Sequence, residues 1–275
     1  MQRITENQNL RGRPRSGKQG QSAFSLIELL VVIVVVSILA AFLSTALNQT
    51  KQRAHQITCL NNLRELSRAW YFYADDNQEW LALNRSLPEN DQTEFSARRH
   101  TAESWVAGNP MEDTTTDPIT SGSLFPYTKS VSLYRCPSDD STVVDQPVLR
   151  NRSYSMSTYM NGDGAGMDPR VKTRLTEINN PSPSKMFVFI EEHQSSIWSG
   201  GFYVSPKSKF SLASASWSST PSDRHAQGCN ISFADLHVEH WKWAWPKGLN
   251  LNNHPAQNHQ ELRDLQRLQD SVPFR

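Results

Sequence analysis

The 275-residue sequence predicts an α+β protein in which a long N-terminal helix, first transmembrane and then amphipathic, packs against a head with a mainly antiparallel β-sheet. Three observations predict this fold class: a long apolar run near the N-terminus, a helical periodicity that continues beyond it, and, after Trp80, short apolar runs broken by Pro, Gly, Asn and Ser. We therefore expect five segments: a cationic leader at 1–23, a transmembrane helix at 24–47, an amphipathic stalk helix at 48–77, a head at 78–250 and a C-terminal tail at 251–275.

The charge of the chain is nearly balanced at +1, so the composition indicates no nucleic-acid partner. The balance conceals an asymmetry, because residues 1–23 carry a net charge of +4 and the following 252 residues a net charge of −3. Apolar residues are also concentrated near the N-terminus, which leaves a polar body after about residue 50. Eight Trp, seven Tyr and eleven Phe are then expected to supply much of its core, as suits a body in an aqueous compartment.

Residues 24–47 read FSLIELLVVIVVVSILAAFLSTAL, with Glu28 as the only charge. A helix of this length rises roughly 36 Å at about 1.5 Å per residue, enough for a hydrocarbon core of about 30 Å. The basic residues precede the apolar run, so the positive-inside rule places residues 1–23 in the cytoplasm and the rest of the chain across the membrane.

Three interpretations of this segment compete. A secretory signal would be cut after the apolar run, with Ser44-Thr45-Ala46 as an acceptable site. A signal anchor would not be cut at all. In the third interpretation, the chain is cut before the apolar run, so that the apolar helix stays in the mature protein. Glu28 separates them, because a carboxylate in a membrane helix costs on the order of 2.5–3.5 kcal/mol and usually has a function. The structural alternative is a glutamate tolerated near the headgroups.

The residues around Glu28, Ala23-Phe24-Ser25-Leu26-Ile27-Glu28, resemble the cleavage and methylation motif of type IV prepilins and type II secretion pseudopilins. The resemblance implies cleavage between Ala23 and Phe24 by a prepilin peptidase, methylation of the new Phe24 amine, and assembly into a fibre through the helix. In that family this glutamate pairs with the N-terminal amine of a neighbouring subunit, which is the assembly role implied for Glu28. The family normally has Gly before the cut. Ala23 is nearly as small, so we still expect processing.

The helix is expected to continue well beyond the membrane, since neither Gly nor Pro occurs between Phe24 and Leu87. Apolar residues recur at spacings of three and four and place one stripe on the helix: Ile57, Leu60, Leu63, Leu66, Trp70 and Tyr73. Asp75-Asp76-Asn77 predicts the end of a helix of roughly 50 residues and about 75 Å. We expect the stripe to pack against the head.

In the head, residues 186–190 predict a buried strand. Residues 230–234 and 237–241 alternate polar and apolar residues, which predicts a hairpin. The Ser-rich stretch at 205–223 predicts an exposed loop, and leucines at every third position in 260–269 predict a short amphipathic helix or a frayed end.

A second resemblance covers most of residues 59–241, to pseudopilin-like proteins with a C-terminal H-x9-DG signature. It rests on five stretches: CLNNLR at 59–64, YADDN at 73–77, CPSD at 136–139, RSYSM at 152–156, and 224–235. His225 and Asp235 have nine residues between them, as in that signature, but Leu236 replaces the glycine. The turn after Asp235 therefore cannot rely on a glycine with positive φ: either its type differs or strain is tolerated. The resemblance points to the secretion protein G-like branch.

Three cysteines allow at most one intramolecular disulfide, and they lie too far apart in the sequence for a CxxC metal knuckle. We expect Cys59 in the stalk to pair with Cys136 in the head, leaving Cys229 free. An oxidising periplasm permits such a bond, which would be worth about 2–4 kcal/mol. The alternative is three free, buried cysteines.

Among possible metal ligands, His225, Asp235, His237 and His240 are the best candidates, because a hairpin can bring several of them together. His237 and His240 alone are a weak pair, since residues three apart in a strand point to opposite faces. We prefer the interpretation in which His225 and Asp235 hydrogen-bond each other or the turn backbone and fix the hairpin, and we predict no metal.

Calcium is the one cofactor left open, through Asn161-Gly162-Asp163-Gly164 with Asp168. This stretch lacks the alternating carboxylates and closing Glu of an EF-hand, so a turn is expected. Glu191-Glu192-His193 offers acid and base groups, but no GxSxG, HExxH, P-loop or GxGxxG accompanies it. We predict that the chain is not an enzyme.

Together the resemblances imply a structural subunit of a type II secretion or type IV pilus-like fibre. Its expected partners are a prepilin peptidase, other subunits of the fibre and an inner-membrane secretion platform, and it would be a single-pass inner-membrane protein with a periplasmic head. The alternative is an anchored minor subunit whose aromatic-rich head binds a glycan or a secreted substrate. A membrane-anchored, metal-dependent hydrolase is the third, disfavoured, interpretation.

Overall fold

The structure is a computed structural model that describes residues 25–84, 104–207, 215–248 and 254–274. The chain divides into two compact units, Met1–Asn48 and Gln49–Arg275, which are treated separately below. Ala23 and Phe24, the two residues of the predicted cleavage site, lie outside the described residues.

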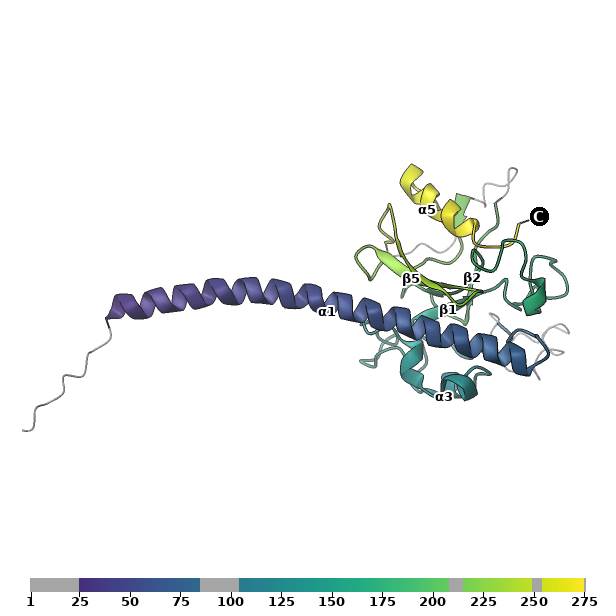
Figure 1. Ribbon diagram of the computed structural model, residues 1–275, viewed down its shortest axis with the longest axis horizontal. Helices are drawn as coiled ribbons and strands as arrows, with labels where there is room; N and C mark the ends of the chain where they lie inside the picture. The colour runs from purple at the N-terminus through teal and green to yellow at the C-terminus, as the bar shows by residue number, and fades with distance from the viewer. Residues whose placement is uncertain (1–24, 85–103, 208–214, 249–253, 275) are drawn as a thin grey trace, which may run out of the picture. The chain divides into compact units, whose positions relative to one another are not determined.

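Helix α1 spans Leu26–Asp76, 51 residues (Figure 1). At its start, the Ser25 hydroxyl accepts a hydrogen bond from the Ile27 N–H at 3.3 Å, and Glu28 Oε2 accepts one from the Ser25 N–H at 2.8 Å, so two backbone N–H groups of the first turn are satisfied. It ends within the predicted Asp75-Asp76-Asn77 segment, where the next two residues turn to positive φ.

In the first unit, the surface of α1 is apolar. From Leu26 to Leu47, its large apolar side chains are between 47% and 81% exposed. Among the described residues, α1 is the one helix that is long and apolar enough to cross a membrane.

In the second unit, five strands form one sheet with the order β3-β1-β2-β5-β6. Every neighbouring pair is antiparallel except β1 and β3, which confirms the α+β class with a mainly antiparallel sheet. The strands are β1 (Tyr154–Ser157), β2 (Phe187–Glu191), β3 (Gly201–Phe202), β5 (Gly228–Phe233) and β6 (Val238–Lys242). A separate antiparallel pair joins β4 (Ser216–Trp217) to β7 (His254–Pro255).

The other helices in the described parts of the chain are much shorter than α1. They are α3 (Asp117–Thr120), α4 (Phe125–Thr128), the 3-10 helices η1 (Val131–Tyr134) and η2 (Leu175–Glu177), and α5 (His259–Gln269). Helix α5 is well formed because Asn258 caps it, its side-chain oxygen accepting from the N–H groups of Gln260 and Glu261 at 2.9 Å each.

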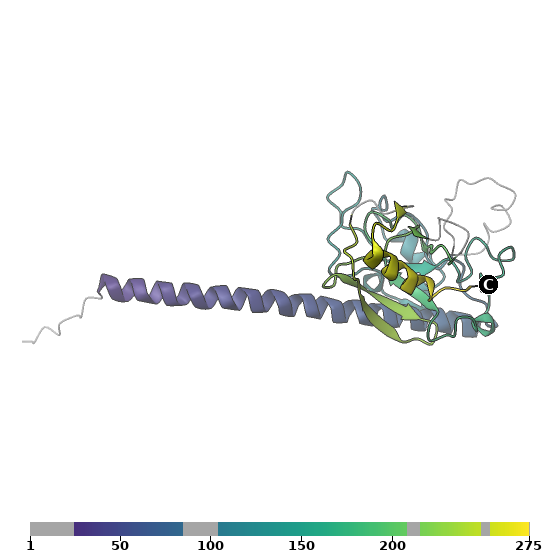
Figure 2. The same cartoon turned by 90° about the horizontal axis from the view of Figure 1, so that it is seen from above.

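The core lies on both faces of the sheet. The C-terminal part of α1 covers one face and α5 lies over the other (Figures 1 and 2), so every residue of β1, β2 and β5 is buried. The predicted strand at 186–190 and the hairpin at 230–241 are confirmed by β2 and by the β5–β6 pair. The largest fully buried side chains are mostly aromatic, including Trp70, Trp105, Trp217 and Trp243.

The buried stripe of α1 differs from the predicted one by a small rotation. Ile57, expected in the stripe, is 59% exposed, whereas Cys59 and Ala74 are fully buried with Leu63, Leu66 and Trp70. The buried residues follow one another at spacings of three or four, as expected for a single helical face. At the N-terminal end of that face, Cys59 is buried and Ile57 is not.

The prediction of an exposed loop at 205–223 is wrong for much of its described part. Trp217, Thr220 and Ser222 are almost completely buried. Backbone groups there are satisfied internally, because the Thr220 N–H donates to Ser196 Oγ at 2.9 Å and the Ser222 N–H to the Glu191 carbonyl at 2.8 Å. A polar sequence is thus buried with these backbone hydrogen bonds made, although the side-chain atoms Trp217 Nε1, Thr220 Oγ1 and Ser222 Oγ are buried without a hydrogen-bond partner.

The turn between β5 and β6 tolerates strain. Leu236 has φ of +74°, in the region that favours glycine. Its N–H donates to the Phe233 carbonyl at 2.9 Å, and the Phe233 N–H donates to the His237 carbonyl at 3.0 Å, so the flanking hydrogen bonds hold this conformation.

We predict that Leu236→Gly is more stable than Leu236→Ala by about 1 kcal/mol, because only the alanine keeps the steric cost of a positive φ. At most positions with negative φ, the alanine variant would be the more stable of the two. Denaturant unfolding of the full chain in detergent, followed by tryptophan fluorescence, measures it. An alanine variant as stable as the glycine variant would show that the turn is unstrained.

A second strong local constraint is a buried ion pair. Lys247, whose side chain is 0% exposed, donates from Nζ to Asp264 Oδ2 at 2.8 Å and lies 4.8 Å from the centre of the Trp217 ring. Burial lowers the pKa of Lys247, and Asp264 opposes that effect. Asp264 also accepts from the N–H groups of Ala244 and Trp245, so it ties α5 to the segment after β6.

Asp264→Ala should therefore lower the free energy of unfolding by about 3–5 kcal/mol, because it leaves a buried cation without its partner. Asp270→Ala is the matched control. It removes the exposed pair with Lys207 and should change stability by less than about 1 kcal/mol. Equal losses in the two variants would contradict the role given to burial.

Candidate functional site

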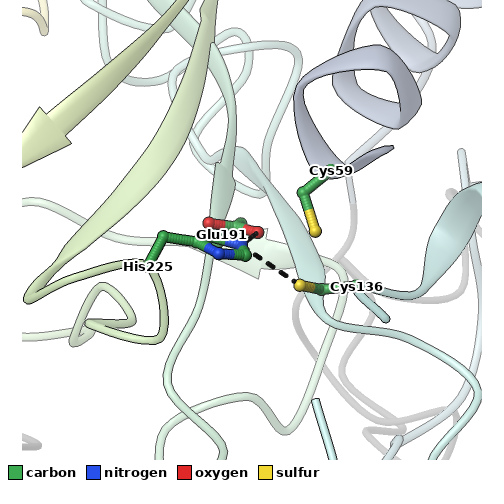
Figure 3. Close-up of side chains that lie close together, drawn as sticks. All are labelled: Cys59, Cys136, Glu191 and His225. Atoms are coloured by element: carbon green, nitrogen blue, oxygen red, sulfur yellow. Dashed lines mark hydrogen bonds and ion pairs between the residues drawn. The ribbon is translucent and has the colours of Figure 1, made fainter. Parts of the chain in front are cut away.

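Four side chains with metal-binding chemistry meet in the head: Cys59, Cys136, Glu191 and His225 (Figure 3). One ligand atom from each lies within 4.8 Å of all the others. All four are buried, the most exposed being His225 at 3%.

The four residues come from separate parts of the chain. Cys59 lies on the buried face of α1, and Cys136 follows η1. Glu191 is the last residue of β2, and His225 lies in the connection that leads into β5. Figure 3 shows the Cys59 side chain extending from α1 towards Cys136, with the His225 ring beside Glu191.

His225 Nε2 is at the centre of the contacts. It lies 3.0 Å from Glu191 Oε1 and 3.3 Å from Cys136 Sγ. The other oxygen of the carboxylate, Oε2, accepts a hydrogen bond from the Asn230 N–H at 2.7 Å. One oxygen of Glu191 is thus fixed by the backbone of β5, which directs the other oxygen into the cluster.

The cluster shifts the ionisation of its members. Burial raises the pKa of Cys59, whereas a hydrogen bond from Cys59 lowers the pKa of Cys136. Burial alone would raise the pKa of Glu191, but its bonds with His225 and with the Asn230 N–H outweigh burial and lower it. Burial also opposes protonation of His225, yet the bonds with Cys136 and Glu191 raise its pKa to about 10.

A second layer of hydrogen bonds holds the cluster in place. The Cys136 N–H donates to Ser153 Oγ at 3.1 Å, and Ser153 Oγ donates to Asp139 Oδ2 at 2.5 Å. Asp139 Oδ2 also lies 3.2 Å from Arg224, the residue before His225. These contacts fix the loops that carry Cys136 and His225 relative to β1. Segments at 136–139, 152–156 and 224–225, on which the second resemblance rests, therefore meet at one place.

The predicted disulfide partners, Cys59 and Cys136, are neighbours in this cluster, and the structure has all three cysteines unbonded. Their pairing as a disulfide stays a prediction. Two thiols, an imidazole and a carboxylate are also the donor types that bind zinc in proteins. The near-complete burial of the four side chains favours a structural role over one that handles a substrate.

The structure does not bring the four predicted metal candidates together at one point. His225 faces Glu191 and Cys136, whereas Asp235 lies in the β5–β6 turn, where it accepts from the His237 N–H at 3.2 Å and contacts the His237 ring. His240 Nδ1 lies 3.1 Å from Asn230 Oδ1. The expected contact of Asp235 with the turn backbone is present, while His225 contacts other residues.

Glu191 is the residue that sequence reasoning did not connect with the cysteines and His225. The sequence groups Glu191 with Glu192 and His193 as possible acid and base residues, but the three side chains take different partners. Glu192 Oε1 accepts from Ser196 Oγ at 2.6 Å, and burial raises the pKa of Glu192 to about 7. His193 Nδ1 lies 2.7 Å from Ser195 Oγ. One feature of the sequence could have indicated a role for Glu191: this carboxylate directly follows the continuous apolar run at 186–190.

In the suggested calcium loop, the Asp168 carboxylate pairs with the Arg170 guanidinium, with contacts of 2.5–3.0 Å. The Asn161 side-chain amide donates to the Leu81 carbonyl at 2.6 Å. Both groups therefore already have protein partners, and calcium binding, which the sequence leaves open beside the expected turn, stays a hypothesis.

Comparison with known proteins identifies the N-terminal segment. The profile of the prokaryotic N-terminal methylation motif matches residues 18–44, a range that contains the predicted cleavage site and Glu28. No curated protein and no solved structure matches the chain. The match does not reach the head, so the H-x9-DG resemblance stays a prediction. The N-terminal segment supports a type IV pilin-like protein.

Proposed function

We propose that the chain is a structural subunit of a type II secretion or type IV pilus-like fibre, which assembles through its N-terminal helix. The observation that carries this proposal is the uncovered apolar surface of α1 between Leu26 and Leu47, which coincides with the matched methylation motif.

Such a surface requires an apolar environment. Transfer of apolar area out of water is worth roughly 25 cal/mol per Å², so large apolar side chains that are half exposed or more favour burial in lipid or against other helices. A bilayer supplies this environment to the precursor, and neighbouring α1 helices supply it in a fibre. The same apolar surface would thus anchor the precursor in the membrane and contact neighbouring subunits in the fibre.

Glu28 is suited to the transition between these states. Its carboxylate accepts a hydrogen bond from the N–H of Ser25, the residue bonded to Phe24. Cleavage before Phe24 would therefore create a cationic amine one residue from a group that Glu28 already binds. We expect the carboxylate to exchange this local contact for the amine of a neighbouring subunit on assembly, because an unpaired charge in lipid is costly.

The proposal includes partners and a location. A prepilin peptidase would remove residues 1–23, and the mature subunit would join other subunits on an inner-membrane secretion platform. The cationic leader favours a cytoplasmic N-terminus and a periplasmic head.

A specific observation favours the second candidate, an anchored minor subunit whose head binds a glycan or secreted substrate. A hollow of about 410 Å³ is lined by Tyr159, Trp198 and Tyr203 together with Asp163 and Asp168. Trp198 and Tyr203 are 46% and 44% exposed, so aromatic faces stand beside carboxylates at an open surface. Retention of glycans by the wild-type chain but not by Trp198→Ala would support this candidate.

For the fibre subunit, we predict that Glu28→Ala abolishes or strongly reduces assembly and leaves the head folded, because Glu28 lies outside the unit that contains the head core. Electron microscopy of sheared fibres and protease resistance of the head measure the two properties. Glu65→Ala, which removes an exposed carboxylate on the same helix, is the control and should assemble normally. Normal fibres from Glu28→Ala would refute the role of this residue.

Processing gives a separate prediction. Mass spectrometry of the protein from cells that contain the peptidase should find a mature N-terminus at Phe24 with one methyl group on its amine. Ala23→Gly should be processed at least as fast, since glycine is the usual residue of the motif. A mature N-terminus after Ala46 would instead indicate a secretory signal, and an intact leader would indicate an uncut anchor.

A further inference from the structure

We propose that Cys59, Cys136, Glu191 and His225 form a structural zinc site that fastens the C-terminal part of α1 to the sheet of the head. This inference rests on the buried cluster alone and does not depend on the assembly of a fibre.

The geometry is close to that of a tetrahedral site. Zinc binds thiolate at about 2.3 Å, imidazole at about 2.0–2.1 Å and carboxylate oxygen at about 2.0–2.2 Å, so ligand atoms around it lie roughly 3.3–3.8 Å apart. In the structure, the Cys136–His225 and Glu191–His225 contacts are 3.3 and 3.0 Å, and every pair of ligand atoms is within 4.8 Å. Small side-chain movements would place all four around one ion.

The donor types select the metal. Two thiolates and an imidazole favour zinc over calcium or magnesium, which prefer oxygen ligands. Glu191 offers one oxygen inward because the Asn230 N–H holds the other. Such outer contacts orient ligands in metal sites, and Ser153 does the same for the backbone of Cys136.

The surroundings indicate a closed site. Cys59, Cys136 and Glu191 are each 0% exposed and His225 is 3% exposed, which leaves little access for water or substrate. Structural zinc sites have four protein ligands, whereas catalytic sites keep one position open. The ligands also come from four distant segments, so one ion would link α1, the connection after η1, β2 and the connection before β5.

A disulfide between Cys59 and Cys136 is the rival, because the two sulfurs are neighbours in the cluster. It would use both thiols and leave Glu191 and His225 as a buried ion pair. Zinc instead uses all four side chains at once. The two states exclude each other, so the redox state of the two thiols in cells separates them.

The test uses the full chain, purified in detergent under argon with a non-chelating reductant, loaded with zinc and then freed of unbound metal by gel filtration. We expect about one zinc per chain by elemental analysis. Replacement by Co²⁺ should give the thiolate-to-cobalt absorption and tetrahedral bands of a mixed sulfur and nitrogen site. A mercurial reagent that modifies thiols should release the metal from the wild-type chain.

Variants locate the site. Cys59→Ser and His225→Ala should lose most of the metal, whereas Cys229→Ser and His237→Ala, which alter a cysteine and a histidine outside the cluster, should retain it. Removal of zinc should lower the melting temperature of the wild-type chain and of these two controls. If a ligand variant does not fold, Glu191→Gln should still change the cobalt spectrum, because one ligand loses its charge.

Three results would overturn the proposal. The first is less than about half an equivalent of zinc in the loaded wild-type chain. The second is metal that Cys59→Ser retains in full. The third is a Cys59–Cys136 disulfide in the peptide map of chain trapped with alkylating reagent directly in cells, since it would identify the native state of the two thiols as oxidised.

Discussion

The head depends on the packing of the second half of α1 against its sheet. Leu63, Leu66 and Trp70 are completely buried there, and they cover one face of strands that have no exposed residue. Without this helix, one face of the sheet would lie open to water. The helix depends on the sheet in turn, because most of the stability of an amphipathic helix comes from the packing of its apolar face. The residues of α1 that stay exposed in this region are mostly polar or charged.

This dependence explains why the fold class could be predicted and some details could not. The helix, the buried strand β2 and the β5–β6 hairpin follow from apolar periodicity, which reports burial directly. The rotation of the α1 stripe away from Ile57 depends on tertiary fit, which no local pattern records. The Ser-rich stretch reads as a loop by composition, but Ser196 and the Glu191 carbonyl satisfy its backbone and allow it to be buried.

The candidate site shows the same division. The sequence indicates Cys59, Cys136 and His225 one by one, and the second resemblance rests on segments that contain them. Their convergence could not be predicted, because it is set by four separate elements. The sequence predicts that His225 and Asp235 hydrogen-bond each other or the turn backbone; Asp235 contacts the turn backbone, whereas the His225 side chain lies beside Glu191 at the end of β2. The spacing of two residues in a sequence therefore did not identify the contact of the histidine side chain.

The two proposals meet in the mechanics of α1. If subunits are held in a fibre through residues 26–47, any load between fibre and head passes along α1 into its contacts with the sheet. Apolar packing resists separation without specifying one register, because neighbouring apolar side chains can substitute for one another.

Cys59 is one helical turn before Leu63 and belongs to a cluster whose other members lie on the head. A bond to a metal, unlike apolar contact, has a fixed length and direction. A zinc ion at this point would fix the rotation and register of the helix where it enters the head.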